Sequence, residues 1–201
     1  MKPIKTAITI RSMPRSEKAQ QFHVRVWRGL WWNSLEHFSL ENKLTGHVLE
    51  GFIVGIMEKK PFNLNYKITC DSKWQTRQAE ITTTHGQERK QLKLVVDQKN
   101  RWLQDDHELA RVRGARDIDI NMTPSTNMLP IKRLHLGPGK SGDITTAWAQ
   151  FPKMTITPGQ QTYTSHGHRA YQYESSRFKT EIKLDQHGIV ENYPPYWKME
   201  A

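Results

Sequence analysis

Short runs in which apolar and polar residues alternate dominate the first half of the chain. In residues 21–28 (QFHVRVWR) this alternation places Phe22, Val24 and Val26 on one face of an extended strand. Breaks rich in Gly, Pro, Asn and Asp, which favour turns, separate such runs. The regular spacing predicts an antiparallel meander, sandwich or barrel. The expected strands are residues 4–11, 21–28, 35–40, 48–57, 64–69, 74–83 and 91–96.

A strand that carries two carboxylates follows in the second half of the chain. In residues 117–120 (DIDI), Asp117 and Asp119 lie two positions apart and therefore share one face of the strand. Buried carboxylates are costly unless a cation or a hydrogen-bond donor pairs with them. Arg133 is one expected partner and Arg77 is another. Arg77 has a second interpretation, in which its guanidinium binds the anionic or hydroxyl groups of a ligand.

The residues after this strand predict a helix. Thr123 supplies a side-chain oxygen, and Pro124 a fixed φ angle, at the point where a helix would begin. We expect a helix over residues 125–136 and a second over residues 105–112. Residues 136–142 (LGPGKSG) have the composition of an exposed loop.

Length, charge and cysteine content narrow the class of protein. A chain of 201 residues suits one core, so we expect a single domain. The formal charge of +10 favours anionic partners, although the basic residues are dispersed along the chain. Cys70 is the single cysteine, which excludes an intramolecular disulfide. The chain shows neither a secretory signal nor an apolar run long enough for a membrane span, and a cytoplasmic location is expected.

Large aromatic side chains are numerous and widely spread, with seven Trp, six Tyr and six Phe. A curled sheet would bring several of them to one interior, where their rings pack on acyl chains and sugar rings alike. The alternative is that the rings only fill a core. The set comprises Trp27, Trp31, Trp32, Trp74, Trp102, Trp148, Tyr171, Tyr173, Phe178, Tyr193, Tyr196 and Trp197.

Residues 117–134 also carry a family resemblance. They match the pattern D-x-D-x-x-x-T-P-x-T-N-x-L-P-I-x-R-L, and the chain thereby resembles a bacterial family of glycolipid-binding proteins. The resemblance runs from about residue 25 to the end and leaves residues 1–20 as an N-terminal extension. It departs at Ala115, where a cysteine is expected, and at Asn100, where a glycine is expected. Further motifs occur in the same order at residues 32–41 (WNSLEHFSLE), 66–77 (YKITCDSKWQTR), 92–102 (LKLVVDQKNRW), 147–152 (AWAQFP) and 185–197 (DQHGIVENYPPYW).

This resemblance implies a mainly β fold, in which a long meandering antiparallel sheet curls into an incompletely closed barrel, or β-roll, around a helical segment. The implied fold is similar to that of the bacterial lipoprotein carriers. Together with the spread of aromatic residues, it implies that a lipid or glycolipid binds in the concave interior without catalysis. Contact with a membrane surface is a further expectation. The expected ligand-binding residues are Arg77, Trp74, Asp117, Asp119, Thr126, Asn127, Arg133, Trp148, Tyr171 and Phe178.

Two other functions stay open at this point. The first is an enzyme that acts on amphiphilic or sugar substrates with Asp117 or Asp119 as its base, although carboxylates on one strand face lie side by side and do not flank a substrate. The second is nucleic-acid binding through the basic surface, with stacking on Trp31 and Trp32. The chain lacks Walker, Rossmann and G-x-S-x-G motifs, and His166 and His168 have no accompanying ligands at metal-binding spacing. We therefore predict no cofactor and no metal.

Overall fold

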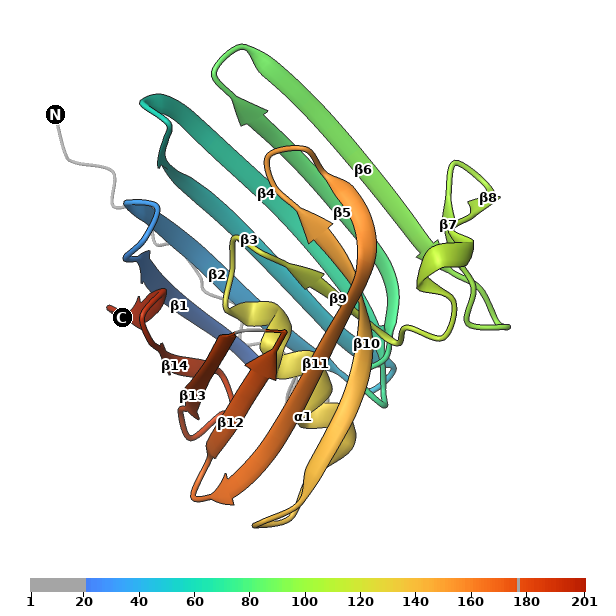
Figure 1. Ribbon diagram of the computed structural model, residues 1–201, viewed down its shortest axis with the longest axis vertical. Coiled ribbons are helices and arrows are strands. Elements are labelled where there is room, and N and C mark those ends of the chain that lie inside the picture. The colour runs from blue at the N-terminus through green and yellow to red at the C-terminus, as the bar shows by residue number, and fades with distance from the viewer. Residues whose placement is uncertain (1–20, 177) are drawn as a thin grey trace, which may run out of the picture.

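The computed structural model describes residues 21–176 and 178–201, and its strands form one large curled sheet (Figure 1). The expected strand over residues 4–11 and the N-terminal extension lie outside these residues. The strands are β1 (Gln21–Gly29), β2 (Ser34–Lys43), β3 (Gly46–Met57), β4 (Lys60–Asp71), β5 (Thr76–His85), β6 (Glu88–Val96), β7 (Trp102–Gln104), β8 (His107–Glu108), β9 (Asp117–Ile120), β10 (Ser141–Gln150), β11 (Thr155–Gly167), β12 (Ala170–Ser175), β13 (Phe178–Leu184), β14 (Val190–Tyr193) and β15 (Trp197–Met199). The helical elements are the 3₁₀ turns η1 (Ala110–Val112) and η2 (Ser125–Asn127) and the α-helix α1 (Met128–Leu134).

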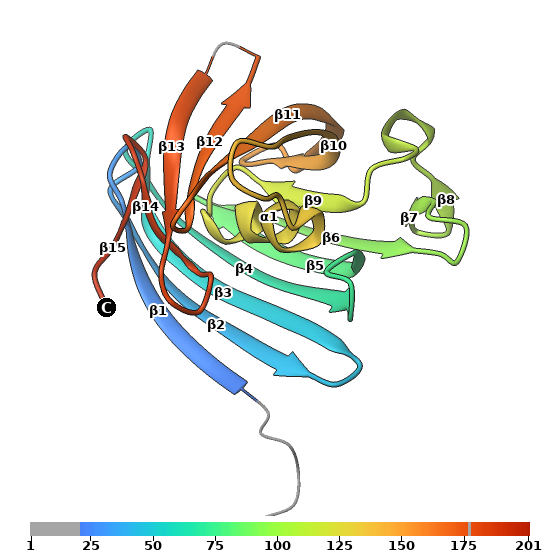
Figure 2. The same cartoon turned by 90° about the horizontal axis from the view of Figure 1, so that it is seen from below.

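The strand order is β8-β7-β6-β5-β4-β3-β2-β1-β15-β14-β13-β12-β11-β10-β9. Neighbouring strands are antiparallel, except that β9 runs parallel to β10. The two halves of the chain join where Gly29 of β1 pairs with Trp197 of β15. Figure 2 shows the sheet curving around α1, which lies on its concave side. The mainly β, curled antiparallel sheet predicted from the sequence is therefore confirmed.

The curl stops short of a closed barrel. Strands β8 and β9 end the sheet and are not paired with each other in the part of the chain that the structure describes. The edge of β9 meets β5 at Thr76, whose backbone N–H donates to the carbonyl oxygen of Arg116 at 3.1 Å. The hydroxyl of Thr76 accepts a hydrogen bond from the N–H of Ile118 at 3.2 Å. Two hydrogen bonds at one residue thus hold this seam.

The alternation of side chains along the strands separates a buried face from an exposed one, as a half-solvated antiparallel sheet requires. On β2 and β3, the side chains of Phe38, Leu40 and Leu49 are buried on the concave face. The apolar residues Phe22 and Val24 of β1 share a face as predicted, but that face is the exposed, convex one. Exposed apolar residues on β2 and β3 extend this convex surface.

The helix predicted over residues 125–136 forms as η2 followed by α1, and Thr123 lies before it as expected. Its hydroxyl accepts a hydrogen bond from the N–H of Ser125 at 3.0 Å. The helix ends at Leu134, because His135 adopts a left-handed conformation with φ of 48°.

Two local predictions are wrong. The helix expected over residues 105–112 is a turn through Asp105 and Asp106, both with positive φ, followed by β8 and η1. The strand expected over residues 74–83 begins only at Thr76, because Trp74 has a left-handed φ of 64° and belongs to the preceding turn.

Gly51 allows the ring of Tyr66 to lie flat across the concave face. These residues are paired on β3 and β4, and a Cβ atom at Gly51 would lie 2.1 Å from the Tyr66 ring. A larger residue at position 51 would therefore push this ring out of place.

We expect Gly51→Ala to lower the free energy of unfolding by about 1–3 kcal/mol, because the added methyl group overpacks the Tyr66 ring. Gly137→Ala is the matched control, since nothing lies within 4 Å of a Cβ atom there. Urea unfolding of both variants measures the difference. Equal stability of the two variants would contradict the assigned packing.

Candidate functional site

A cavity of about 620 Å³ lies inside the curl, between η2 and the second half of the sheet. Aromatic side chains form much of its wall and contact one another. The ring of Phe178 lies 4.9 Å from that of Tyr196, and the ring of Tyr193 lies 5.1 Å from that of Trp197, measured between ring centroids. We call this space the aromatic cavity. Its aromatic lining residues are Trp31, Trp32, Trp148, Tyr173, Phe178, Tyr193, Tyr196 and Trp197.

The turn between β1 and β2 forms one border of the aromatic cavity. There Leu30 is 53% exposed and Trp31 is 70% exposed, although both are large apolar residues. The neighbouring Trp32 stacks on Tyr196, with 5.6 Å between ring centroids, and is partly buried. The nucleic-acid alternative requires both Trp31 and Trp32 to be exposed for stacking on bases. Only Trp31 is exposed, because Trp32 packs on Tyr196.

Asp119 is the one carboxylate among the described residues that line the aromatic cavity. It lies deep inside the molecule, and part of its surface is accessible because it faces this space. Thr126 Oγ1 donates to its Oδ1 at 3.1 Å, and Gln161 Nε2 donates to its Oδ2 at 2.7 Å. Burial raises the pKa of Asp119 to about 6, although these two hydrogen bonds oppose the shift.

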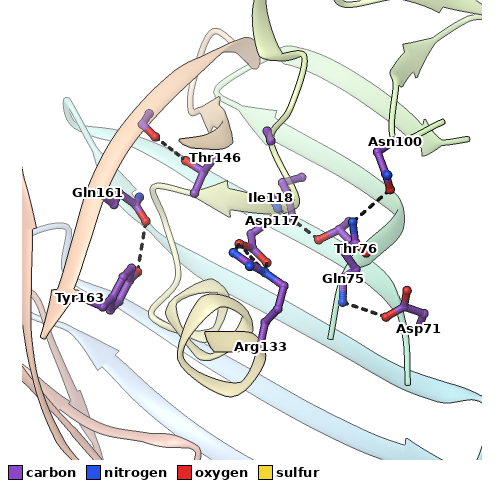
Figure 3. Close-up of polar contacts among 12 residues, drawn as sticks. Asp71, Gln75, Thr76, Asn100, Asp117, Ile118, Arg133, Thr146, Gln161 and Tyr163 are labelled. Atoms are coloured by element: carbon purple, nitrogen blue, oxygen red, sulfur yellow. Dashed lines mark hydrogen bonds and ion pairs between the residues drawn. The ribbon is translucent and has the colours of Figure 1, made fainter. Parts of the chain in front are cut away.

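Gln161 is itself held in place by a hydrogen bond. The single O–H of Tyr163 is shared between two acceptors, Asn127 Oδ1 at 2.8 Å and Gln161 Oε1 at 3.1 Å. Figure 3 shows the contact between Tyr163 and Gln161. The amide that faces Asp119 is thus oriented by a buried tyrosine.

Asp117 is paired very differently from Asp119, although they are two residues apart on β9. Its side chain is 0% exposed, and Arg133 of α1 donates to it through Nε at 3.1 Å and through Nη2 (Figure 3). Arg133 is therefore the partner of Asp117, as one of the two predictions had it.

The other predicted partner, Arg77, is bound elsewhere. Its Nε and Nη2 donate to Asp71 Oδ2 at 3.1 and 2.7 Å, and its Nη1 donates to Asn100 at 3.2 Å. The prediction that Arg77 pairs with Asp117 or Asp119 is therefore wrong. Asp71 also accepts hydrogen bonds from the N–H groups of Lys73 and Gln75, as a residue that caps a turn does.

Glu36 on β2 is a third carboxyl group inside the curl, and it is only 2% exposed. Its Oε1 accepts hydrogen bonds from Tyr66 at 2.6 Å and from Thr123 at 2.8 Å. Its Oε2 has no partner among the described residues. Burial raises the pKa of Glu36 to about 8, so the protonated form prevails at neutral pH. The sequence did contain a signal for this residue, because Glu36 is the acidic residue on the face of β2 that carries Phe38 and Leu40.

Six of the ten predicted ligand-binding residues line one of two cavities, whereas Arg77, Asp117, Thr126 and Tyr171 line neither. Asp119, Asn127, Trp148 and Phe178 line the aromatic cavity, and Thr126 is linked to it through Asp119. Trp74 and Arg133 line a second, smaller cavity of about 380 Å³. Tyr171 is partly buried and packs against the core. Of the residues not proposed from the sequence, Asn121 and Gln160 also line the aromatic cavity, with no sequence signal that marks them.

Comparison with known proteins places the chain in a family. The family model described as "Putative glycolipid-binding" matches residues 24–199. The chain belongs to this family. No curated protein was found to match the chain.

A crystal structure of a DUF1089 family protein from Pseudomonas aeruginosa is similar to the chain, with a TM-score of 0.73 and 24% sequence identity. The match covers 96% of this chain and 99% of that one, so the two proteins share a fold. Among the described residues of the present chain, no helix is long and apolar enough to cross a membrane.

The raised pKa of Glu36 predicts that stability falls as pH rises. Between the ordinary pKa of 4.5 and the folded value of about 8, the folded state keeps a proton that the unfolded state releases. The free energy of unfolding therefore decreases by up to about 1.4 kcal/mol per pH unit in this window, and the stabilisation is fully present only below pH 4.5. We expect Glu36→Gln, which cannot ionise, to remove this slope.

Urea unfolding at pH 5, 6.5 and 8 measures the effect. The stability of Glu36→Gln relative to the native protein should increase as pH rises. Glu50→Gln, at an exposed position on β3, is the control, and its stability should change with pH as that of the native protein does. Parallel curves for Glu36→Gln would show that Glu36 is ionised in the folded state.

Proposed function

We propose that the protein binds a lipid or glycolipid in the aromatic cavity without transforming it. The observation that carries the proposal is a cavity of about 620 Å³ with an aromatic wall and Asp119 within it. Small-molecule sites commonly have volumes of about 300–1,000 Å³, with mainly apolar walls and a few fixed polar groups. Membership of a family named for glycolipid binding supports the same function.

The aromatic rings and the polar groups have separate tasks in this proposal. The rings of Phe178, Tyr193 and Trp197 bury the apolar part of the ligand, and this burial contributes most of the affinity, at about 25 cal/mol per Å² before the cost of association. Aromatic faces also pack against sugar rings. The wall therefore suits both the acyl and the sugar part of a glycolipid.

Asp119 and Asn127 supply the polar recognition. The Asp119 carboxylate has about four lone-pair sites, of which Thr126 and Gln161 occupy two. The remaining sites accept hydrogen bonds from the hydroxyl groups of a sugar. A carboxylate that faces a cavity without a cation favours such neutral donors over an anionic headgroup.

The exposed apolar residues beside the aromatic cavity suit a ligand that enters from a membrane surface. Leu30 and Trp31 project from the turn that borders the aromatic cavity, and Trp favours the interface between water and lipid. Lys59 lies in the turn between β3 and β4, at the same end of the sheet. We propose that this end rests on the bilayer when the ligand enters.

Octyl glucoside, kept below its micelle concentration, tests the cavity as a simple glycolipid analogue. We expect saturable binding in calorimetry that Phe178→Ala weakens about tenfold or more, because the variant removes part of the apolar wall. Phe52→Ala is the matched control, since Phe52 lies on the exposed convex face. Absence of saturable binding, together with a ligand-free mass in native mass spectrometry of protein from a bacterial lysate, would refute the proposal.

An enzyme is the second candidate, because Asp119 has a pKa raised to about 6 and faces a cavity, as a general base requires. Mass spectrometry of the amphiphile after incubation separates the two functions. Binding returns octyl glucoside intact. Glucose and octanol released by the native protein, and not by Asp119→Asn, would establish catalysis instead.

Flotation with vesicles of phosphatidylcholine and phosphatidylglycerol tests the membrane contact. Replacing Leu30 and Trp31 together by Ser should reduce the floated fraction severalfold, because it removes the exposed apolar side chains beside the cavity. Leu44→Ser is the control, since Leu44 is 85% exposed in the turn between β2 and β3, at the opposite end of these strands. Equal flotation of all three proteins would exclude this docking end.

A further inference from the structure

The second cavity lies apart from the aromatic cavity and has no lining residue in common with it. The turn between β4 and β5 forms one side, and the C-terminal end of α1 forms another. We call it the basic cavity. Its lining residues are Ser72, Lys73, Trp74, Gln75, Arg116, Arg133 and His135.

Positive charge exceeds negative charge around the basic cavity. The two nearby carboxylates are already engaged, Asp117 by Arg133 and Asp71 by Arg77. Lys73 and Arg116 take part in none of the ion pairs found in residues 21–176 and 178–201. These two cations therefore have no carboxylate of their own.

One further cation, Lys132, stands beside the basic cavity, against the ring of Trp74. The Lys132 ammonium group lies 4.9 Å from the centroid of the Trp74 ring, and His47 stacks on the same ring at 3.6 Å. The pKa of Lys132 is lowered by burial, and the pKa of His47 is lowered by burial and by the charge of Lys132. An anion bound here would relieve an excess of positive charge.

One donor of the basic cavity, Arg133, is fixed before any ligand arrives. Arg133 is mostly buried and holds Asp117 through Nε and Nη2, while no hydrogen bond found among the described residues uses its Nη1. Trp74, in the turn beside these donors, is held in a left-handed conformation, which is unfavourable for a bulky residue. The backbone N–H of Trp74 donates to the backbone carbonyl oxygen of Asp71 at 3.0 Å, and this hydrogen bond fixes the turn.

We propose that the basic cavity is a binding site for a phosphate or sulfate group. Lys73, Arg116 and the Nη1 group of Arg133 would donate to its oxygens, since guanidinium and ammonium groups are the usual partners of such oxyanions. The polar, cationic lining suits an oxyanion better than the apolar part of an amphiphile. The site uses no residue of the aromatic cavity and is independent of the function proposed for that cavity.

Calorimetric titration with sodium phosphate at constant ionic strength tests the site. We expect saturable binding that Lys73→Gln and Arg116→Gln each weaken at least tenfold. Both side chains are exposed and lie outside the ion pairs of the described residues, so both variants should fold. Arg111→Gln, which removes one exposed positive charge on η1, should bind phosphate as the native protein does.

A second arm identifies the source of the phosphate group. Vesicles of phosphatidylcholine with and without phosphatidic acid are compared in flotation. Retention that depends on phosphatidic acid and is lost in Arg116→Gln assigns the site to a lipid headgroup, whereas binding of inorganic phosphate alone assigns it to a small soluble anion. No saturable binding in either arm, or an equal loss in Arg111→Gln, would overturn the proposal. Binding of octyl glucoside by Arg116→Gln reports separately on the aromatic cavity.

Discussion

The fold depends on how three carboxyl groups inside the curled sheet, those of Glu36, Asp117 and Asp119, are accommodated away from water. Removing a carboxyl group from water is costly, and each of the three is accommodated differently. Asp117 forms an ion pair, Asp119 accepts two hydrogen bonds, and Glu36 keeps its proton at neutral pH. One short segment, residues 123–134, supplies a partner to all three through Thr123, Thr126 and Arg133. The helical segment is therefore held on the concave face by polar contacts as well as by packing.

The same segment gives the interior two environments. Its beginning, at Thr123 and Asn127, lines the aromatic cavity, and its end, at Arg133, lines the basic cavity. Asp119 meets no cation, so the first environment combines a single carboxyl group with aromatic walls. The basic residues on the other side leave an excess of positive charge. The two ligands proposed, a neutral ring-bearing amphiphile and a small anion, correspond to these two environments.

Sequence reasoning recovered what local patterns determine. Alternation gave β1 to β6, Thr123 and Pro124 gave the start of the helix, and Arg133 was one of two partners predicted for Asp117; the strands from β10 onward were not assigned individually. What it missed depends on how the sheet curls. The exposed face of β1 is as apolar as a buried one, so its sequence does not show which face turns inward. From the sequence, Arg77 and Arg133 were equally good partners for the carboxylates; in the structure Arg77 is bound by Asp71. The left-handed conformation of Trp74 could not be predicted, because no residue type near it indicates a positive φ.

The seam at Thr76 also has a mechanical consequence. In a closed barrel the number and stagger of the strands set the diameter, so the interior cannot widen without breaking a whole ladder. Here the free edge of β9 meets β5 through hydrogen bonds at a single residue. Opening the sheet at that line would break these two hydrogen bonds, while every strand of the ladder would keep its paired neighbours.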